Sequence, residues 1–214
     1  MRMPTTIALP LIVTVLALAG CGSQPDAEHS GTEAPATPQA PVSPPAHVDP
    51  DHPDAPPPVP LAADLTRNEW ATAQNKGECA PLVLTSDGGA PAEARRANFG
   101  GGWGIAFDTE DVRSAYGVAG PGIVGADRAD GQEARLRGQW PYFTMLENLP
   151  QPSFAGYGLE GARPYREEVP DGVSENSLAY VHVAGQACTY NVWSRLGRAH
   201  LEVLMQSLRP GPKE

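Results

Sequence analysis

Large apolar side chains are distributed very unevenly along this chain. Residues 7–19 form an apolar run interrupted only by Pro10 and Thr14, residues 22–60 contain no aromatic side chain, and residues 61–209 contain all of the Trp, Tyr and Phe. A segment without large apolar side chains cannot bury enough surface to offset the entropy lost on ordering. We therefore predict a short leader at 1–20, a disordered, Pro- and Ala-rich acidic tether at 21–60, and a globular domain at 61–214.

The clearest pattern within the domain lies near its C-terminal end. Residues 178–184 and 187–194 alternate between two kinds of side chain on either side of Gly185-Gln186. This pattern predicts an antiparallel hairpin with a two-residue type II′ turn. Because alternate residues share a face, the core face should carry Ala179, Val181, Val183, Cys188, Tyr190 and Val192. The other face should carry Leu178, Tyr180, His182, Asn191 and Trp193, with Leu178 opposite Trp193.

Helical spacing appears at both ends of the domain. Apolar residues at 201, 204, 205 and 208 form one stripe and predict a helix over 198–208 that ends before Pro210. Residues 61–75 predict a first helix, with Leu61, Leu65 and Trp70 toward the core. Strands are expected at 81–85, 103–107, 113–119 and 140–146, and residues 150–177 stay unassigned. Together these elements predict a single α+β domain, mainly an antiparallel sheet with N-terminal and C-terminal helices packed on it.

The apolar run at 7–19 closes with Leu18-Ala19-Gly20-Cys21. Such a run is too short to span a bilayer and has the length of a signal-peptide core. The four closing residues resemble the lipobox of bacterial lipoproteins. The resemblance covers only this segment and implies that the Cys21 thiol receives a diacylglyceryl group and that the signal is cut just before it. It also implies attachment to the outer membrane on its periplasmic side, or to the outer face of the cell membrane.

Two cysteines remain for the domain after Cys21 is lipidated. They are Cys79 and Cys188, and an exported domain with two cysteines favours a disulfide between them. The pairing would tie the first part of the domain to the last.

Charge and motifs exclude several classes of function. The net charge of −10 argues against nucleic acid as a partner, because binding to phosphates needs a basic surface. The run from Gly120 to Gly125 matches a dinucleotide fingerprint, but Pro121 stands in the tight turn and no clear helix follows, so no cofactor is assigned. We find no catalytic set, and no metal site is assigned within the domain.

These observations favour a lipid-anchored, non-enzymatic binding or scaffold domain in the cell envelope. The expected partners are the membrane, through the lipid, and an envelope protein, a cell-wall glycan or a small apolar molecule. The candidate binding face is the second face of the hairpin, with Leu178, Tyr180, His182 and Trp193. If another layer, such as residues 150–177, covers this face, the same side chains belong to the core.

Two alternatives stay open. One is an enzyme that acts on envelope polymers, which would need convergent polar side chains in a cleft. The other is a metal-handling lipoprotein that uses the tether residues His47, Asp49, Asp51, His52 and Asp54.

Overall fold

A computed structural model describes residues 57–123 and 128–213. The predicted leader, the lipidation site Cys21 and the tether as far as residue 56 lie outside the described residues. Within the described part, Leu61 is the first residue tied to the fold, because its backbone N–H donates to the carbonyl of Leu84 at 2.7 Å. Helices in this part of the chain are all too short or too polar to cross a membrane.

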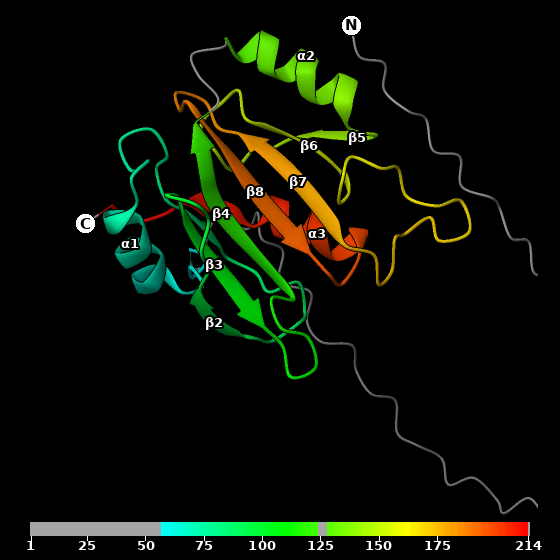
Figure 1. The fold of residues 1–214 in the computed structure, drawn as a ribbon, viewed down its shortest axis with the longest axis horizontal. Coiled ribbons are helices and arrows are strands. Elements are labelled where there is room, and N and C mark those ends of the chain that lie inside the picture. The colour runs from blue at the N-terminus through cyan, green and yellow to red at the C-terminus, as the bar shows by residue number, and fades with distance from the viewer. Residues whose placement is uncertain (1–56, 124–127, 214) are drawn as a thin grey trace, which may run out of the picture. The chain divides into compact units, whose positions relative to one another are not determined.

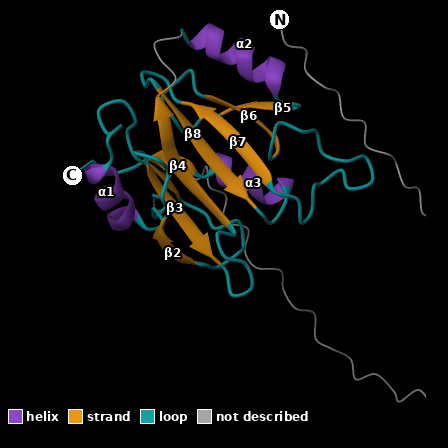
Figure 2. Cartoon of the chain, in the orientation of Figure 1, coloured by secondary structure: helices purple, strands orange, loops and turns teal. Residues whose placement is uncertain are grey.

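Seven antiparallel strands form the main sheet (Figure 1). Its order across the sheet is β2 (Glu93–Arg96), β3 (Trp103–Asp108), β4 (Tyr116–Ile123), β8 (Cys188–Ser194), β7 (Ser177–His182), β6 (Phe154–Leu159) and β5 (Tyr142–Met145). A separate two-stranded sheet pairs β1 (Leu82–Leu84) with β9 (Leu208–Pro210). The helices are α1 (Ala63–Thr72), α2 (Ala129–Gln139) and α3 (Arg198–Gln206). The chain therefore folds as the predicted α+β domain, as Figure 2 shows by element type.

The hairpin β7–β8 has the predicted register but a different turn. Val181 lies opposite Tyr190, and Leu178 lies opposite Trp193. The Gln186 N–H donates to the carbonyl of Val183 at 3.1 Å, which makes Ala184 and Gly185 the central residues. Gly185 has φ 76° at the second central position, whereas a type II′ turn needs the glycine first. The turn prediction was therefore wrong, although the pairing that it was meant to explain is correct.

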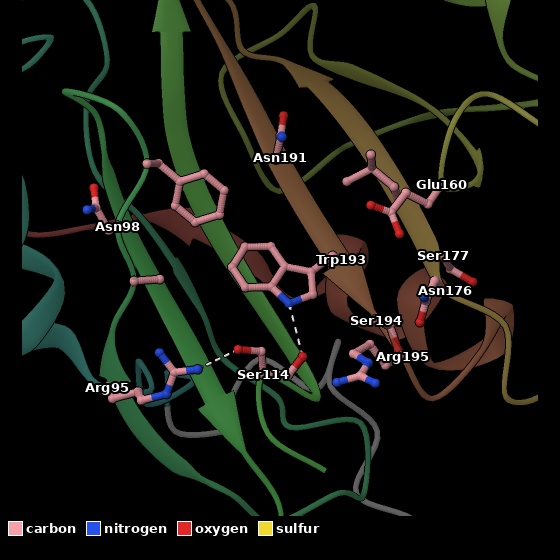
Figure 3. A pocket seen from close by; sticks show the side chains of 13 residues that line it. Arg95, Asn98, Ser114, Glu160, Asn176, Ser177, Asn191, Trp193, Ser194 and Arg195 are labelled. Atoms are coloured by element: carbon pink, nitrogen blue, oxygen red, sulfur yellow. Dashed lines mark hydrogen bonds between the residues drawn. The ribbon is translucent and has the colours of Figure 1, made fainter.

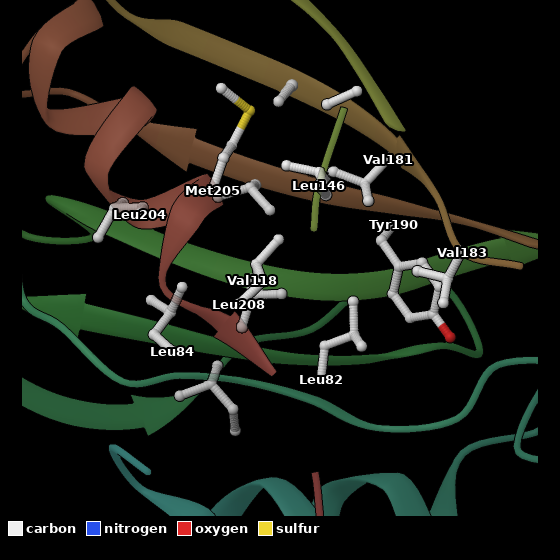
Figure 4. Close-up of a cluster of buried hydrophobic side chains, with 14 of the residues drawn as sticks. Leu82, Leu84, Val118, Leu146, Val181, Val183, Tyr190, Leu204, Met205 and Leu208 are labelled. Atoms are coloured by element: carbon white, nitrogen blue, oxygen red, sulfur yellow. The ribbon is translucent and has the colours of Figure 1, made fainter. Parts of the chain in front are cut away.

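The core lies between the sheet and α3, which runs behind β7 and β8 in Figure 1. Leu201, Leu204 and Met205 on α3 are fully buried against the predicted core face of the hairpin. Figure 4 shows Leu204 and Met205 beside Val181 and the other labelled core residues. The helix ends at Gln206, so its predicted extension to residue 208 was wrong. Leu208 is still buried, but it pairs with Leu84 in the small sheet, where the backbone finds hydrogen bonds that a longer helix would forgo.

The N-terminal helix α1 is shorter than predicted and contacts β1, β2 and β3. Leu61, Leu65 and Trp70 pack against the core, as expected from their spacing. The Trp70 indole N–H donates to the carbonyl of Cys79 at 2.7 Å, which joins the helix to the disulfide-bearing segment.

Besides β9, three elements have no counterpart in the predicted set. Edge strand β2 lacks apolar alternation, β6 falls in the unassigned segment, and α2 is polar around most of its surface. The strand predicted at 113–119 begins three residues later, because residues 113 and 114 form a turn. Helix α2 packs Leu136, together with Trp140 just beyond its end, on Phe154 of β6. It covers one end of the sheet face opposite α3.

Candidate functional site

The sheet face opposite α3, called the open face below, is paved with small residues. One row across it reads Gly104, Ala119, Asn191, Tyr180 and Gly156, and the next reads Ala106, Gly117, Trp193, Leu178 and Gly158. A Cβ on Gly117 would lie 2.2 Å from Cζ2 of Trp193. The glycines therefore let aromatic rings lie directly on the backbone and leave the face hollow between them.

Trp193 is the largest side chain on the open face outside the area that α2 covers. Its ring lies 5.5 Å from the ring of Phe99, which in turn rests on Gly104. The Trp193 indole N–H donates to the carbonyl of Ser114 at 3.3 Å (Figure 3). These two contacts fix the orientation of the indole. The indole is half-buried, so part of its surface is still exposed to solvent.

Trp193 is the floor of a pocket of about 550 Å³. One wall comes from the segment 95–99 and Ser114, and the other from Glu160, Asn176 and Leu178 (Figure 3). A second pocket of about 730 Å³ lies between α2 and the strands β7 and β8. Both volumes are typical of small-ligand sites.

Asn191 lines both pockets, so they adjoin on β8. We call the two together the sheet groove. The Asn191 Oδ1 atom is buried and has no hydrogen-bond partner among the described residues. Buried polar atoms in folded proteins are nearly always paired, and an unpaired acceptor costs about 1–3 kcal/mol. The residue that joins the two pockets therefore carries a buried amide oxygen without a partner among the described residues.

A rigid polar wall borders the groove beside Trp193. Arg95 donates from Nε to Asp108 Oδ2 at 2.8 Å and from Nη2 to the Ser114 hydroxyl. The hydrogen bond from Arg95 and a second one from the Ser114 backbone N–H hold the pKa of Asp108 below its usual value. The Asp108 carboxylate is therefore ionised, and its hydrogen bonds to Arg95 and Ser114 hold it within the wall.

The four predicted binding residues do not share one environment. Leu178 and Trp193 line the first pocket, and Tyr180 lines the second, all three half-buried. His182 is 9% exposed and stacks on Phe154 with ring centroids 4.8 Å apart. Burial lowers the pKa of His182. The layer that covers this end of the face is α2, whereas the segment 150–177 supplies strand β6 of the sheet and some of the residues that line the two pockets.

The disulfide prediction is confirmed. Cys79 and Cys188 are bonded, with Cα atoms 5.2 Å apart and both residues buried. Disulfides persist in oxidising compartments, so the bond indicates an extracytoplasmic domain.

A buried serine–histidine pair lies under the sheet, close to the groove. Ser194 Oγ lies 2.9 Å from Nδ1 of His200, and His200 Nε2 lies 2.9 Å from the carbonyl oxygen of Asp87. The carbonyl can only accept, so Nε2 carries the hydrogen and Nδ1 accepts from the serine. Ser194 is 0% exposed and also accepts the Leu196 N–H, so this pair fastens the segment at 87 to α3 and presents no nucleophile to solvent.

In the described ranges no group of three or more His, Cys, Asp or Glu side chains is placed to hold a metal ion. The tether residues of the metal-handling alternative, His47 to Asp54, lie outside those ranges.

Sequence reasoning missed the groove residues on α2 and on the segment 95–99. The available signal for α2 was the spacing of Gln132, Leu136 and Trp140 at intervals of four, which places them on one side of a helix. No local signal marks the approach of Phe99 to Gly104. Comparison with protein-family models, with curated proteins and with solved structures finds no match to this chain.

Proposed function

We propose that this protein is a lipid-anchored lipoprotein of the cell envelope whose domain binds an envelope component in the sheet groove without transforming it. The Cys79–Cys188 disulfide supports an extracytoplasmic location, and the lipobox-like residues before Cys21 support the anchor. The observation that carries the binding role is the groove itself, where two pockets adjoin at an unpaired buried amide oxygen.

A blocking substitution tests the binding role. Asn191→Trp would fill the junction of the two pockets, while Asn148→Trp would place the same side chain at an exposed amide outside the groove lining. Full-length wild type and both variants would be immobilised and exposed to separated glycan, lipid and protein fractions of the envelope. Retention of a fraction by wild type and Asn148→Trp, but not by Asn191→Trp, is the expected result. Equal retention by all three proteins, or by none, would refute binding in the groove.

The anchor needs a separate test. Wild-type chain expressed with labelled fatty acid should take up label and partition into detergent, whereas Cys21→Ser should do neither. Wild type that takes up no label and stays in the aqueous phase would contradict the lipoprotein assignment.

A further inference from the structure

We infer that the ligand of the sheet groove is an uncharged oligosaccharide segment of an envelope glycan, an inference that rests on the proposed function. It specifies the chemical class of ligand, for which the groove offers three features: aromatic surfaces, carboxamides and an uncharged floor.

The aromatic surfaces are half-buried rings fixed by their neighbours. Tyr180 packs on Trp140 with centroids 5.3 Å apart, and Trp193 packs on Phe99. Tyr180 lies opposite Asn191, so Tyr180 and Trp193 are diagonal neighbours, with Cα atoms about 7–8 Å apart. Pyranose rings carry C–H groups on their faces and stack on aromatic rings. Two rings held on a diagonal offer two stacking positions along one sugar chain.

The polar lining includes several amides. Five carboxamide side chains border the groove: Asn98, Asn176, Asn191, Gln132 and Gln139. A carboxamide carries both an acceptor and donors, and a sugar hydroxyl is likewise both. The hydrogen-bonding groups of the carboxamides therefore match a ligand that is rich in hydroxyl groups.

Three arginines and Glu160 line the groove, but none of them lies on β8, which forms the floor. Arg95 is paired with Asp108, and Arg195 shares the first pocket with Glu160. In the second pocket Arg135 lies on the exposed side of α2. The floor between Trp193 and Tyr180 is the amide of Asn191. Anion recognition needs donors with positive charge at the point of contact, so this floor favours an uncharged ligand.

Two other ligand classes fit less well. A peptide that binds through its main chain needs a free sheet edge, but the groove lies over β8, whose backbone pairs with β4 on one side and β7 on the other. A small apolar molecule would cover the apolar part of the lining but would leave the bordering carboxamides without hydrogen-bond partners. The floor on β8 runs from Thr189 to Ser194, about 17 Å at the usual strand rise, which is long enough for several sugar rings.

A substitution at Asn191 can separate a loss of binding from a loss of stability. Because Asn191 Oδ1 has no partner among the described residues, Asn191→Ala breaks no hydrogen bond of that atom and should leave thermal stability unchanged or raised. Asn191 lines both pockets, so a ligand hydroxyl that hydrogen-bonds to its side-chain amide in wild type would lose that partner. Affinity should therefore fall at least tenfold while the domain stays folded.

The experiment is isothermal titration of the full-length chain with neutral hexasaccharides: cellohexaose, mannohexaose, maltohexaose and chitohexaose. Hexagalacturonate and a pool of decapeptides represent anionic glycans and peptides. Wild type, Asn191→Ala and the control Asn148→Ala would be compared, with a thermal melt for each. We expect wild type and Asn148→Ala to bind at least one neutral hexasaccharide alike, and Asn191→Ala to bind it at least tenfold more weakly.

Three results would overturn the glycan inference. They are binding of only the anionic glycan or the peptides, binding of neutral glycan equally by all three proteins, and binding of none of the probes. The first would leave the groove as a binding site for another ligand class. Failure of the proposed function itself is recognised separately, by fraction retention that does not change in Asn191→Trp.

Discussion

The disulfide should supply much of the stability of this domain. Cys79 and Cys188 are separated by 109 residues, so the bond closes a loop that includes most of the sheet. In the chain-entropy description, closing a loop of this length lowers the entropy of the unfolded chain by an amount worth about 4.8 kcal/mol at 25 °C. Domains of this size are stable by only about 5–15 kcal/mol in total. Reduction should therefore remove a large fraction of the free energy of unfolding.

The measurement is urea unfolding of the full chain in a Cys21→Ser background, in which only these two thiols remain. Oxidised protein would be compared with protein that is unfolded, reduced and refolded under reductant, which differs only by the broken S–S bond and the two hydrogen atoms that the thiols gain. The expected loss corresponds to a fall of about 10–20 °C in melting temperature for a chain of this length. Cys79→Ala with Cys188→Ala should show a similar loss, increased by the missing packing of two buried sulfur atoms.

A loss below about 1 kcal/mol on reduction would refute this reasoning. It would mean that the reduced, unfolded chain already holds the two segments together, or that the bond strains the folded state by as much as it constrains the unfolded one. The dependence of the unfolding free energy on urea distinguishes the two, because residual structure in the unfolded chain lowers that slope.

Three further predictions concern the open face and the loop beside it. Gly117→Ala should destabilise the domain by about 1–3 kcal/mol in urea unfolding, because its Cβ would lie 2.2 Å from Cζ2 of Trp193, and an unchanged unfolding midpoint would contradict the close packing. Burial lowers the pKa of His182 below 6.5, so the unfolded chain binds more protons at this residue than the folded chain does. The stability from His182 should be full above pH 6.5 and fall as the pH drops toward the folded-state pKa, so His182→Phe should show a smaller fall in melting temperature than wild type between pH 7.5 and 5. Arg198→Ala removes a guanidinium 4.5 Å from the ring centroid of Tyr142 and a hydrogen bond to the carbonyl of Pro170, so we expect the free energy of unfolding to fall by about 1–2 kcal/mol and proteolysis within 163–176 to become faster. A proteolysis rate equal to that of wild type would show that the arginine does not hold the loop.

Local patterns predicted the elements whose side chains alternate strongly between two environments. The hairpin register followed from alternation, and the buried stripe of α3 followed from Leu201, Leu204 and Met205 at helical spacing. The turn at Gly185 was misplaced because a glycine with positive φ suits more than one turn type, and the choice depends on which carbonyl lies within reach. The end of α3 was misplaced because β9 exists only where β1 is present to pair with it.

Amino-acid sequence alone was enough to determine the α+β class, the disulfide partners and the two faces of the hairpin. The class and the two faces depend on local periodicity, and the disulfide partners depend on the number of cysteines. Neither the periodicity nor the number of cysteines changes with the arrangement of distant segments. The groove was decided only by the tertiary structure. Its first pocket brings the segment 95–99 to Trp193, almost 100 residues further along the chain, and the contact of Phe99 with Trp193 depends on Gly104 and Gly117 on neighbouring strands. Whether Asn191 Oδ1 has a hydrogen-bond partner depends on every segment that packs around it, and no local sequence pattern predicts this.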